Sequence, residues 1–264
     1  MKPLADMPRE VAAAIHTVFS DIDDTLTTEG RLTVEAYGAL QALKDAGVRV
    51  VLVTGRPAGW CDHIARMWPV DAVIGENGAF YLWYDAEARR LKSRHVADEP
   101  TRAVNAEKLA DVKARILREV PGCAAASDQF CRLYDIAIDF CEDVPPLPAA
   151  DIQRIVALME EAGMTAKVSS IHVNGWFGEY DKLSMAHLYL RERCGMELEA
   201  QKDRVTFAGD SPNDAPMFAY VPNAVGVANV RKFNLPADQS PAWVTPSEGG
   251  AGFAELARAI LAAR

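Results

Sequence analysis

The segment from Val18 to Thr27 constrains the fold of this chain more than any other. A short apolar run, predicted as a buried strand, leads into a loop in which Asp21 and Asp23 stand two residues apart. In open α/β sheets, ligands bind at the carboxyl ends of the strands. There, one carboxylate is suited to nucleophilic attack and the second to proton transfer. Because crowded carboxylates repel each other, the segment also indicates a bound cation. A plain strand-to-helix loop or a fragment of a calcium loop is the alternative.

Size and charge limit the kinds of function that remain open. The chain has 264 residues, which is enough for one large domain or two modest ones with real cores. Half of the residues are hydrophobic and a quarter are charged, as in an ordinary soluble globular protein. A net charge of −9 argues against general nucleic-acid binding and repels phosphate esters. A phosphate site would therefore need a local lysine, arginine or metal ion.

The cysteines and the N-terminal segment predict the compartment. The five cysteines are odd in number and scattered, and no C-x-x-C pair occurs, so the pattern supports neither a disulfide framework nor a zinc site. The N-terminal apolar patch is too short for a signal peptide, and no apolar run approaches the length of a membrane span. We expect a cytoplasmic protein that does not associate with a membrane.

Strands and helices alternate on both sides of a long central segment. The near-continuous apolar run Val48–Val53 is typical of a parallel strand covered on both faces. The alternation predicts an α/β fold, a Rossmann-like, doubly wound parallel sheet. We expect its strands near residues 17–20, 48–53, 72–75, 204–208, 224–227 and 243–244, and its helices near 32–46, 57–67, 182–194 and 253–261.

The segment 83–175 breaks this alternation and predicts an inserted α+β cap domain. It contains strand patterns beside only two helix patterns, and the first strand pair flanks a charged turn. The predicted strands cover 80–84, 91–96, 133–140 and 165–173, and the predicted helices cover 106–120 and 152–162. The domain assignment is therefore a core of residues 1–82 and 176–264 with a cap of residues 83–175. The segment Gly249–Gly252 is interpreted as the loop that caps the final helix.

Four polar features stand at strand ends or at a helix start of the predicted sheet. They are Asp21 with Asp23, the segment Thr54-Gly55-Arg56, Lys182, and Asp210 with Asp214 in the segment 209–214. Each alone has an ordinary explanation: a helix cap, a solvated lysine or a plain turn. Together they match a phosphoryl-transfer site, in which carboxylates hold Mg²⁺, a hydroxyl and an ammonium group bind phosphoryl oxygens, and an aspartate attacks phosphorus.

This ordered set resembles the haloacid dehalogenase superfamily of phosphatases over nearly the whole chain. Asp21-Ile22-Asp23-Asp24-Thr25 resembles its first motif, Val53-Thr54-Gly55-Arg56 its second, Lys182 its third and Gly209–Asp214 its fourth. The long insertion, with Gly75–Ala79 just before it, is similar to the branch containing Cof-like, sucrose-phosphate and mannosyl-phosphoglycerate phosphatases; phosphomannomutase shares that cap type. Many relatives carry glycine where this chain has Asp24.

The resemblance implies a role for each matching residue. Asp21 would be the nucleophile that forms an aspartyl-phosphate, and Asp23 would protonate the leaving oxygen and then activate water. Magnesium would be bound by the side chains of Asp21 and Asp210 and by the backbone carbonyl of Asp23. Asp214 would orient a metal-bound water or Lys182, although direct ligation stays open.

The phosphoryl oxygens would be bound by residues from three of the motifs. The resemblance assigns this role to Thr54, Gly55, Lys182 and Asn213. For Arg56 two alternatives stand: contact with phosphate or substrate, or pairing with an acid at the edge of the cap. Three tryptophans, Trp60, Trp83 and Trp176, could either form a pocket wall or pack in the core. His172 and Asn174, where the chain returns from the cap, could either contact substrate or form hydrogen bonds at the hinge.

The sequence therefore predicts a magnesium-dependent phosphatase that hydrolyses a small phosphorylated metabolite, with a sugar phosphate as the expected substrate. The expected partner is a small phosphate ester rather than nucleic acid, and the protein is expected to be a monomer or homodimer. The first alternative is a phosphosugar mutase or phosphotransferase that uses the same aspartyl chemistry. The second is a non-catalytic binding protein, against which the complete set of motif residues argues.

Overall fold

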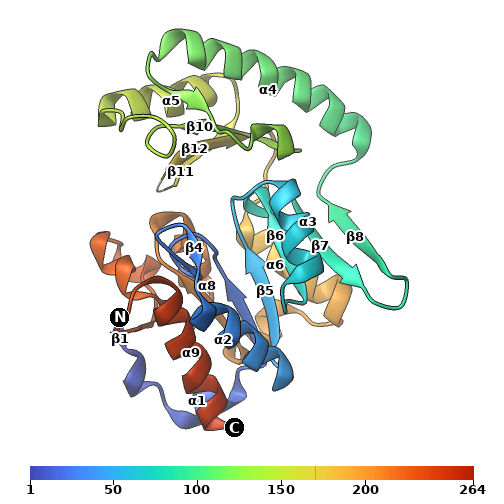
Figure 1. The fold of residues 1–264 in the computed structure, drawn as a ribbon, viewed down its shortest axis with the longest axis vertical. Helices are drawn as coiled ribbons and strands as arrows, with labels where there is room; N and C mark the ends of the chain where they lie inside the picture. The colour runs from blue at the N-terminus through green and yellow to red at the C-terminus, as the bar shows by residue number, and fades with distance from the viewer. Residues whose placement is uncertain (170) are drawn as a thin grey trace.

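A single nine-stranded sheet forms the centre of the larger part of the molecule (Figure 1). The computed structural model describes residues 1–169 and 171–264. The first seven strands along the sheet are parallel, and the last two are antiparallel. Their order is β1 (Lys2–Pro3), β15 (Trp243–Val244), β14 (Val225–Gly226), β13 (Val205–Gly209), β2 (Thr17–Ser20), β5 (Arg49–Val53), β6 (Ala72–Gly75), β7 (Phe80–Asp85) and β8 (Arg90–His95).

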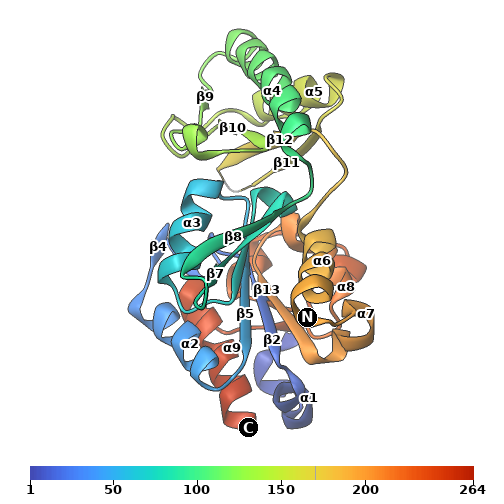
Figure 2. The same ribbon diagram turned by 90° about the vertical axis from the view of Figure 1, so that its right-hand side faces the viewer.

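Helices cover both faces of this sheet, which confirms the predicted α/β class (Figure 2). The helices of one face are α2 (Val34–Asp45), α3 (Ala58–Met67) and α9 (Gly249–Ala263), with α1 (Arg9–Ala14) beside α9. The helices of the other face are α6 (Lys182–Cys194), α7 (Leu198–Gln201) and α8 (Ala215–Tyr220). Alternate residues of a strand point to opposite faces, so Val50 and Leu52 join the first core whereas Val51 and Val53 join the second. This two-sided burial explains the continuous apolar runs.

The order of the strands places the predicted motif residues together. The chain leaves β2 toward β5 on one side, and β13 lies next to β2 on the other side, so the strand order reverses between β2 and β13. The loops that follow β2, β5 and β13 therefore meet at the carboxyl edge of the sheet, where a crevice forms in folds of this kind. A small hairpin, β3 (Thr27–Thr28) with β4 (Arg31–Leu32), follows the first of these loops.

The strand pair β7–β8 differs from the sequence analysis, which assigned residues 83–96 to the inserted domain. Both strands extend the nine-stranded sheet, with β7 antiparallel to β6 and β8 antiparallel to β7. Their alternating pattern predicted the hairpin correctly. An alternating pattern, however, does not reveal which sheet edge a hairpin joins, because that depends on contacts far apart in the sequence. We therefore propose that the cap begins after β8 rather than at residue 83.

The inserted segment forms a separate layer above the carboxyl edge of the large sheet (Figures 1 and 2). Its four strands lie in the order β11 (Thr165–Val168), β12 (His172–Trp176), β10 (Asp135–Asp139) and β9 (Ala124–Ala125). Its two helices, α4 (Glu99–Glu119) and α5 (Ala149–Glu161), pack on one face through a hydrophobic core of their own. The sequence predicted residues 165–173 as strand, and residue 170 of that range lies outside the described residues.

The starts of two helices and the burial of one strand differ from the prediction. Helix α4 begins seven residues earlier than predicted, because the side chain of Asp98 caps it by accepting from the backbone N–H of Thr101. Helix α9 begins at Gly249, so the glycine-rich segment interpreted as a loop forms its first turn. Strand β10 is completely buried rather than half-buried, because its polar face is covered by the core domain.

A glycine near the third predicted motif makes the closest backbone contact in this part of the molecule. Gly78 has φ 110°, and a Cβ atom placed there would lie 2.1 Å from the carbonyl oxygen of Asp181. We expect Gly78→Ala to lower the free energy of unfolding by at least about 3 kcal/mol, because strain is added to a steric clash. Gly47→Ala is the matched control, since Gly47 also has positive φ (72°) but has no atom within 4 Å of the added Cβ. Its cost should be about 1 kcal/mol. Equal urea midpoints for the two variants would contradict the clash.

Candidate active site

Three buried aspartates from two adjacent loops form a carboxylate cluster at the carboxyl edge of the sheet. Asp21 follows β2, whereas Asp210 and Asp214 follow β13. One carboxylate oxygen of each lies within 4.8 Å of the others. The 3₁₀ turn Pro212–Asp214 folds Asp214 back, so that its Oδ2 accepts from the backbone N–H of Asp210 at 3.0 Å.

Lys182 supplies the positive charge of this cluster. It is the first residue of α6, whose N-terminus is fixed by a capping box between Asp181 and Ser184. Its Nζ atom donates to Oδ1 of Asp21 at 2.6 Å and to Oδ1 of Asp214 at 2.8 Å. All three side chains are buried. Asp214 was predicted to orient a metal-bound water or Lys182, with direct ligation left open, and its hydrogen bond with Lys182 agrees with the second of these roles.

The electrostatics of the cluster indicate that it lacks positive charge. Burial raises the pKa of Asp210 to about 9, with further contributions from Asp214 and Asp21. Burial also raises the pKa of Asp21 to about 8, although Lys182 opposes this shift. Burial lowers the pKa of Lys182, but the two aspartates more than offset that effect. One ammonium group thus faces three carboxylates, and a hard divalent cation with oxygen ligands fits this donor set.

Two neutral donors hold the carboxylate of Asp210. The hydroxyl of Thr25 donates to its Oδ1 at 3.0 Å, and the amide of Asn229 lies 3.4 Å from its Oδ2. Asn229 also donates to the carbonyl oxygen of Asp24 at 2.7 Å. Asp24 adopts φ 58°, a left-handed conformation that favours glycine. This conformation is a physical reason for the glycine that the family resemblance implies at this position.

The loop after β5 carries the second predicted motif. Thr54 is completely buried, and its hydroxyl accepts from the backbone N–H of Arg56 at 3.0 Å. Gly55 lies against the side chain of Asn77: a Cβ atom at residue 55 would be 3.2 Å from Oδ1 of Asn77. A side chain at this position would push Asn77 out of place.

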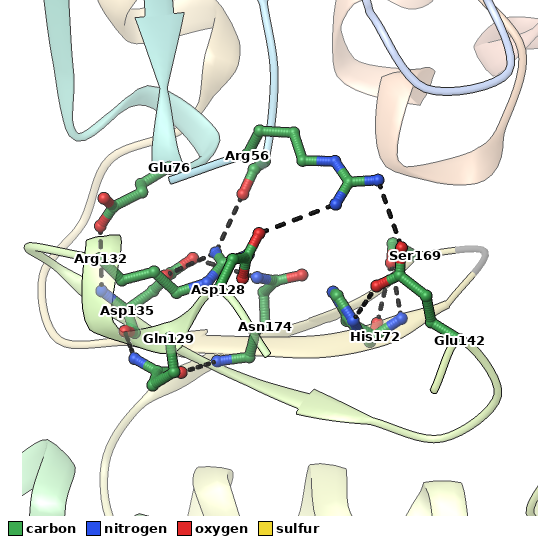
Figure 3. A network of polar contacts seen from close by, with 12 residues as sticks. Arg56, Glu76, Asp128, Gln129, Arg132, Asp135, Glu142, Ser169, His172 and Asn174 are labelled. Atoms are coloured by element: carbon green, nitrogen blue, oxygen red, sulfur yellow. Dashed lines mark hydrogen bonds and ion pairs between the residues drawn. The ribbon is translucent and has the colours of Figure 1, made fainter. Parts of the chain in front are cut away.

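Arg56 pairs with acids, which was one of its two predicted alternatives. Its guanidinium group binds both carboxylate oxygens of Asp23, at 2.9 to 3.1 Å, and stacks on the ring of Trp60 at 4.5 Å. It also lies 3.7 Å from a carboxylate oxygen of Asp128 and 3.6 Å from one of Glu142, both in the cap. Arg56 therefore connects the second aspartate of the first motif to the edge of the cap. Figure 3 shows its contacts with the two cap acids, Asp128 and Glu142.

The cap contributes a polar wall that faces the core domain (Figure 3). Asp135 of β10 and two residues of β12, His172 and Asn174, point toward the core domain because they alternate with residues packed on α4 and α5. The amide of Asn174 donates to Asp135 at 3.1 Å, and Arg132 donates to the same carboxylate at 2.9 Å. Trp176, one of the three tryptophans considered in the sequence, is buried in β12 as well.

A small cavity of about 40 Å³ separates this wall from the motif loops. A second cavity of about 420 Å³ opens beside it, next to Lys182, Trp176 and Tyr180. Asn77 and Asn213 line both cavities. The small cavity is lined by residues of the first, second and fourth motifs and by the cap: Asp21, Asp23, Gly55, Arg56, Arg132, His172, Asn174 and Asp210.

The structure brings the predicted residues together but adds several that the sequence analysis missed. Asp23 turns toward Arg56, whereas the carboxylate cluster consists of the other three predicted aspartates. The residues without a predicted role are Glu76, Asn77, Asp128, Arg132, Glu142 and Asn229. The segment Gly75–Ala79 carried a family resemblance, and this was the available signal for Glu76 and Asn77. The cap residues have no motif, so only their tertiary contacts identify them.

His172 makes part of the stability depend on pH. Burial lowers its pKa to about 4, with Arg132 and Arg56 acting in the same direction, although its Nε2 lies 2.9 Å from Oε2 of Glu142. A lowered pKa in the folded state means full stability above about pH 6.5, with loss as pH falls toward 4. The loss for His172 should approach about 3 kcal/mol at the low end.

This dependence can be measured from urea midpoints between pH 7.5 and pH 4.5. His172→Gln should reduce the loss of stability, leaving the part due to His95, whose pKa burial also lowers to about 4. His63→Gln, at an exposed position, should retain the full loss. An unchanged profile in His172→Gln would show that this imidazole does not limit stability in acid.

Comparison with known proteins places the chain among relatives of one kind. A family model described as haloacid dehalogenase-like hydrolase matches residues 18–110. A phosphoglycolate phosphatase from Pyrobaculum neutrophilum is 31% identical over 245 residues, covering 91% of this chain and 93% of that protein. A second phosphoglycolate phosphatase, from Methanoculleus marisnigri, is 24% identical over 248 residues and covers 92% and 96%, respectively.

Solved structures share the fold over almost the full chain. A Thermoplasma acidophilum protein superposes with a TM-score of 0.71 at 17% identity and covers 94% of this chain and 98% of its own. A HAD/COF-like hydrolase from Plasmodium vivax gives 0.69 at 16% identity, with 97% and 100% covered. Among the described residues, the helices are too short or too polar to cross a lipid bilayer.

Proposed function

Because this chain belongs to the haloacid dehalogenase-like hydrolases, we propose that it is a magnesium-dependent phosphatase that acts through an aspartyl-phosphate. The observation that carries the proposal is the contact of the buried Lys182 with both Asp21 and Asp214, beside Asp210. Such a site presents a nucleophilic carboxylate next to fixed positive charge, which phosphoryl transfer requires. All of these groups come from the core domain.

In the proposed first step, Asp21 attacks phosphorus. Lys182 holds Oδ1 of Asp21, which leaves Oδ2 to form the new P–O bond while the bond to the ester oxygen breaks. Asp23 protonates the departing ester oxygen, so the product alcohol leaves neutral. Lys182 and the loop from Thr54 to Gly55 neutralise charge on the phosphoryl oxygens, with Asn213 at the opposite side.

In the proposed second step, water hydrolyses the aspartyl-phosphate. Asp23, now ionised, takes a proton from the water as its oxygen bonds to phosphorus, and the P–Oδ2 bond breaks to restore Asp21. Asp21, Asp210 and the backbone carbonyl of Asp23 would hold Mg²⁺, with Asp214 directing Lys182. When bound, the ion would supply positive charge that stabilises the transferring phosphoryl group. Arg56 would keep the Asp23 side chain pointed at the cavity.

The substrate that we favour is a compact phosphorylated carboxylic acid of the phosphoglycolate class. Both curated relatives are phosphoglycolate phosphatases. The cavity of about 40 Å³ suits a compact ester, because by this measure it holds only about three water molecules. Arg56 and Arg132 lie at its wall and offer positive charge to a carboxylate.

A sugar phosphate, which the sequence analysis expected, is the second candidate. The adjacent cavity of about 420 Å³ would accept a larger alcohol group beside Trp176 and Tyr180. Two cap carboxylates, Asp128 and Glu142, could accept hydrogen bonds from sugar hydroxyls. The same observations apply to the alternative of a phosphosugar mutase, which would return the phosphoryl group to a sugar.

The decisive experiment measures phosphate release from a panel containing phosphoglycolate, several sugar phosphates, nucleotides and an aryl phosphate. Each ester is assayed with Mg²⁺ and after chelation by EDTA. We expect Mg²⁺-dependent release with phosphoglycolate ranked first; a sugar phosphate ranked first would favour the second candidate. Isomerisation of a sugar phosphate, activated by its bisphosphate and without release, would indicate a mutase. Folded protein that binds metal but attacks none of the esters would favour a binding role.

A further inference from the structure

Glu76 links the core domain to the cap through backbone hydrogen bonds (Figure 3). The residue follows β6 and is completely buried. Its Oε2 accepts from the backbone N–H groups of Tyr134 at 2.6 Å, Leu133 at 3.1 Å and Asp135 at 3.3 Å. Its Oε1 accepts from Leu133 as well, at 3.0 Å. One carboxylate of the core thus receives three consecutive amides of the cap.

The same carboxylate also holds the loop that carries the second motif. Oε1 of Glu76 accepts from the backbone N–H of Ala58 at 3.0 Å, at the start of α3. The backbone N–H of Glu76 donates to the carbonyl of Arg56 at 3.1 Å, and that of Asn77 donates to the carbonyl of Thr54 at 3.0 Å. The turn at residues 76–77 therefore contacts the phosphate-binding loop on one side and the cap on the other.

The turn adopts an unfavourable backbone conformation to make these contacts. Glu76 has φ 42° and Asn77 has φ 56°, both in the left-handed region, and Gly78 follows with φ 110°. Two consecutive non-glycine residues in this region are strained, and such strain persists only where surrounding contacts compensate for it. Here the compensating contacts are the amides that Glu76 receives, which indicates that the conformation serves the junction of the two domains.

On the cap side, the amides that Glu76 binds adjoin the polar wall of the site. Arg132 precedes them and donates to the carbonyl of Gly55 at 3.0 Å and to Asp135 at 2.9 Å. Asp135 in turn accepts from Asn174. Any shift of the segment 132–135 would therefore move this wall relative to the phosphate-binding loop.

We infer that Glu76 is a positioning residue that holds the cap closed over the active site by binding the backbone of residues 133–135. Its carboxylate binds backbone N–H groups rather than the proposed reacting groups. It therefore acts through Arg132, Asp135 and Asn174. Its effect on catalysis rests on the proposed phosphatase function, whereas its effect on the cap does not. The two can be tested separately.

The first test measures amide hydrogen exchange by NMR in the full-length protein. Glu76→Gln keeps the side-chain length but replaces one acceptor oxygen with an amide group that faces N–H donors. We expect exchange at Leu133, Tyr134 and Asp135 to rise at least tenfold, with exchange inside the cap strands β10 and β12 beyond these residues unchanged. Glu192→Gln is the matched control, because Glu192 is a carboxylate of the core domain that bonds the side chains of Tyr81 and Arg94, in the large sheet, rather than residues 133–135. Unchanged protection at 133–135 in folded Glu76→Gln would overturn the inference.

The second test uses the preferred ester from the substrate panel. We expect Glu76→Gln to raise KM at least tenfold and to lower kcat less than threefold, because the reacting groups of the core stay in place. Unchanged kinetics would contradict the positioning role even where exchange has changed. A fall in kcat of at least tenfold at constant KM would contradict it as well. If the protein proved to lack phosphatase activity, the exchange result would still decide the structural part.

A second variant, on the cap side, tests the inference if Glu76→Gln does not fold. Leu133→Pro removes the N–H group that lies between the two oxygens of Glu76, at a side chain that is about half exposed. We expect the same increase in exchange at Tyr134 and Asp135 as in Glu76→Gln. If Glu76→Gln does not fold and Leu133→Pro leaves these two amides protected, the inference is wrong.

Discussion

Asp21→Asn is expected to reduce phosphate release by at least a thousandfold while the protein stays folded. The amide oxygen of asparagine is a poor nucleophile, so no aspartyl-phosphate would form, and loss of a nucleophile costs several orders of magnitude in kcat. The change also removes one of three crowded carboxylates, of which Asp21 and Asp210 both have a pKa raised by burial. The free energy of unfolding should therefore change little, since relief of repulsion offsets the lost contact with Lys182.

The measurement is Mg²⁺-dependent phosphate release together with the thermal unfolding midpoint. Asp62→Asn is the control, because Asp62 is an exposed aspartate that pairs with Arg66 on the surface of α3. It should keep full activity. Residual activity of Asp21→Asn above about one part in a hundred would exclude Asp21 as the nucleophile.

Lys182→Met is expected to damage both catalysis and stability. Methionine matches the length of the lysine stem but leaves Asp21 and Asp214 without the ammonium group that lies 2.6 and 2.8 Å away. Breaking a buried ion pair on one side costs about 3 to 5 kcal/mol, because the remaining charge stays buried without its partner. Phosphate release should fall at least about a hundredfold, since the transition-state charge on the phosphoryl oxygens loses a fixed cation.

Unfolding in EDTA and in Mg²⁺ distinguishes this explanation from simple loss of packing. A cation that binds the carboxylate cluster should raise the unfolding midpoint of Lys182→Met more than that of the natural sequence, because it replaces part of the missing charge. Lys202→Met is the control, as Lys202 is exposed and pairs with Glu199 on the surface. It should change the free energy of unfolding by less than about 0.5 kcal/mol. An equal metal response in all three proteins would argue against a cation at the cluster.

The elements of the core could be predicted from sequence because their signals are local. Strands β5 and β6 and helix α6 occur within one residue of their predicted bounds. A continuous apolar run is sufficient to identify a strand covered on both faces, and helix starts and stops carry their own capping residues. The proposed motif residues could also be located, because loops after parallel strands must meet at one edge of a sheet.

The arrangement of charges around these residues required the tertiary structure. The sequence left open whether Arg56 contacts substrate or an acid, and its ion pairs with Asp23, Asp128 and Glu142 come from positions 33 to 86 residues apart. The pairing of Lys182 with Asp21 spans 161 residues. Separations of this length leave no trace in local periodicity, which reports only the direction of a side chain and not what lies opposite it.

The sequence by itself therefore determined the α/β class, and it predicted a long insertion and a set of motif residues. The tertiary structure decided that β7 and β8 extend the large sheet, that the polar face of the cap sheet is buried against the core, and that Glu76 joins the two. The physical reason is the same in each case. Alternation and apolar runs specify which side of an element is buried, whereas the covering partner is selected by packing and hydrogen bonding between segments distant in the chain.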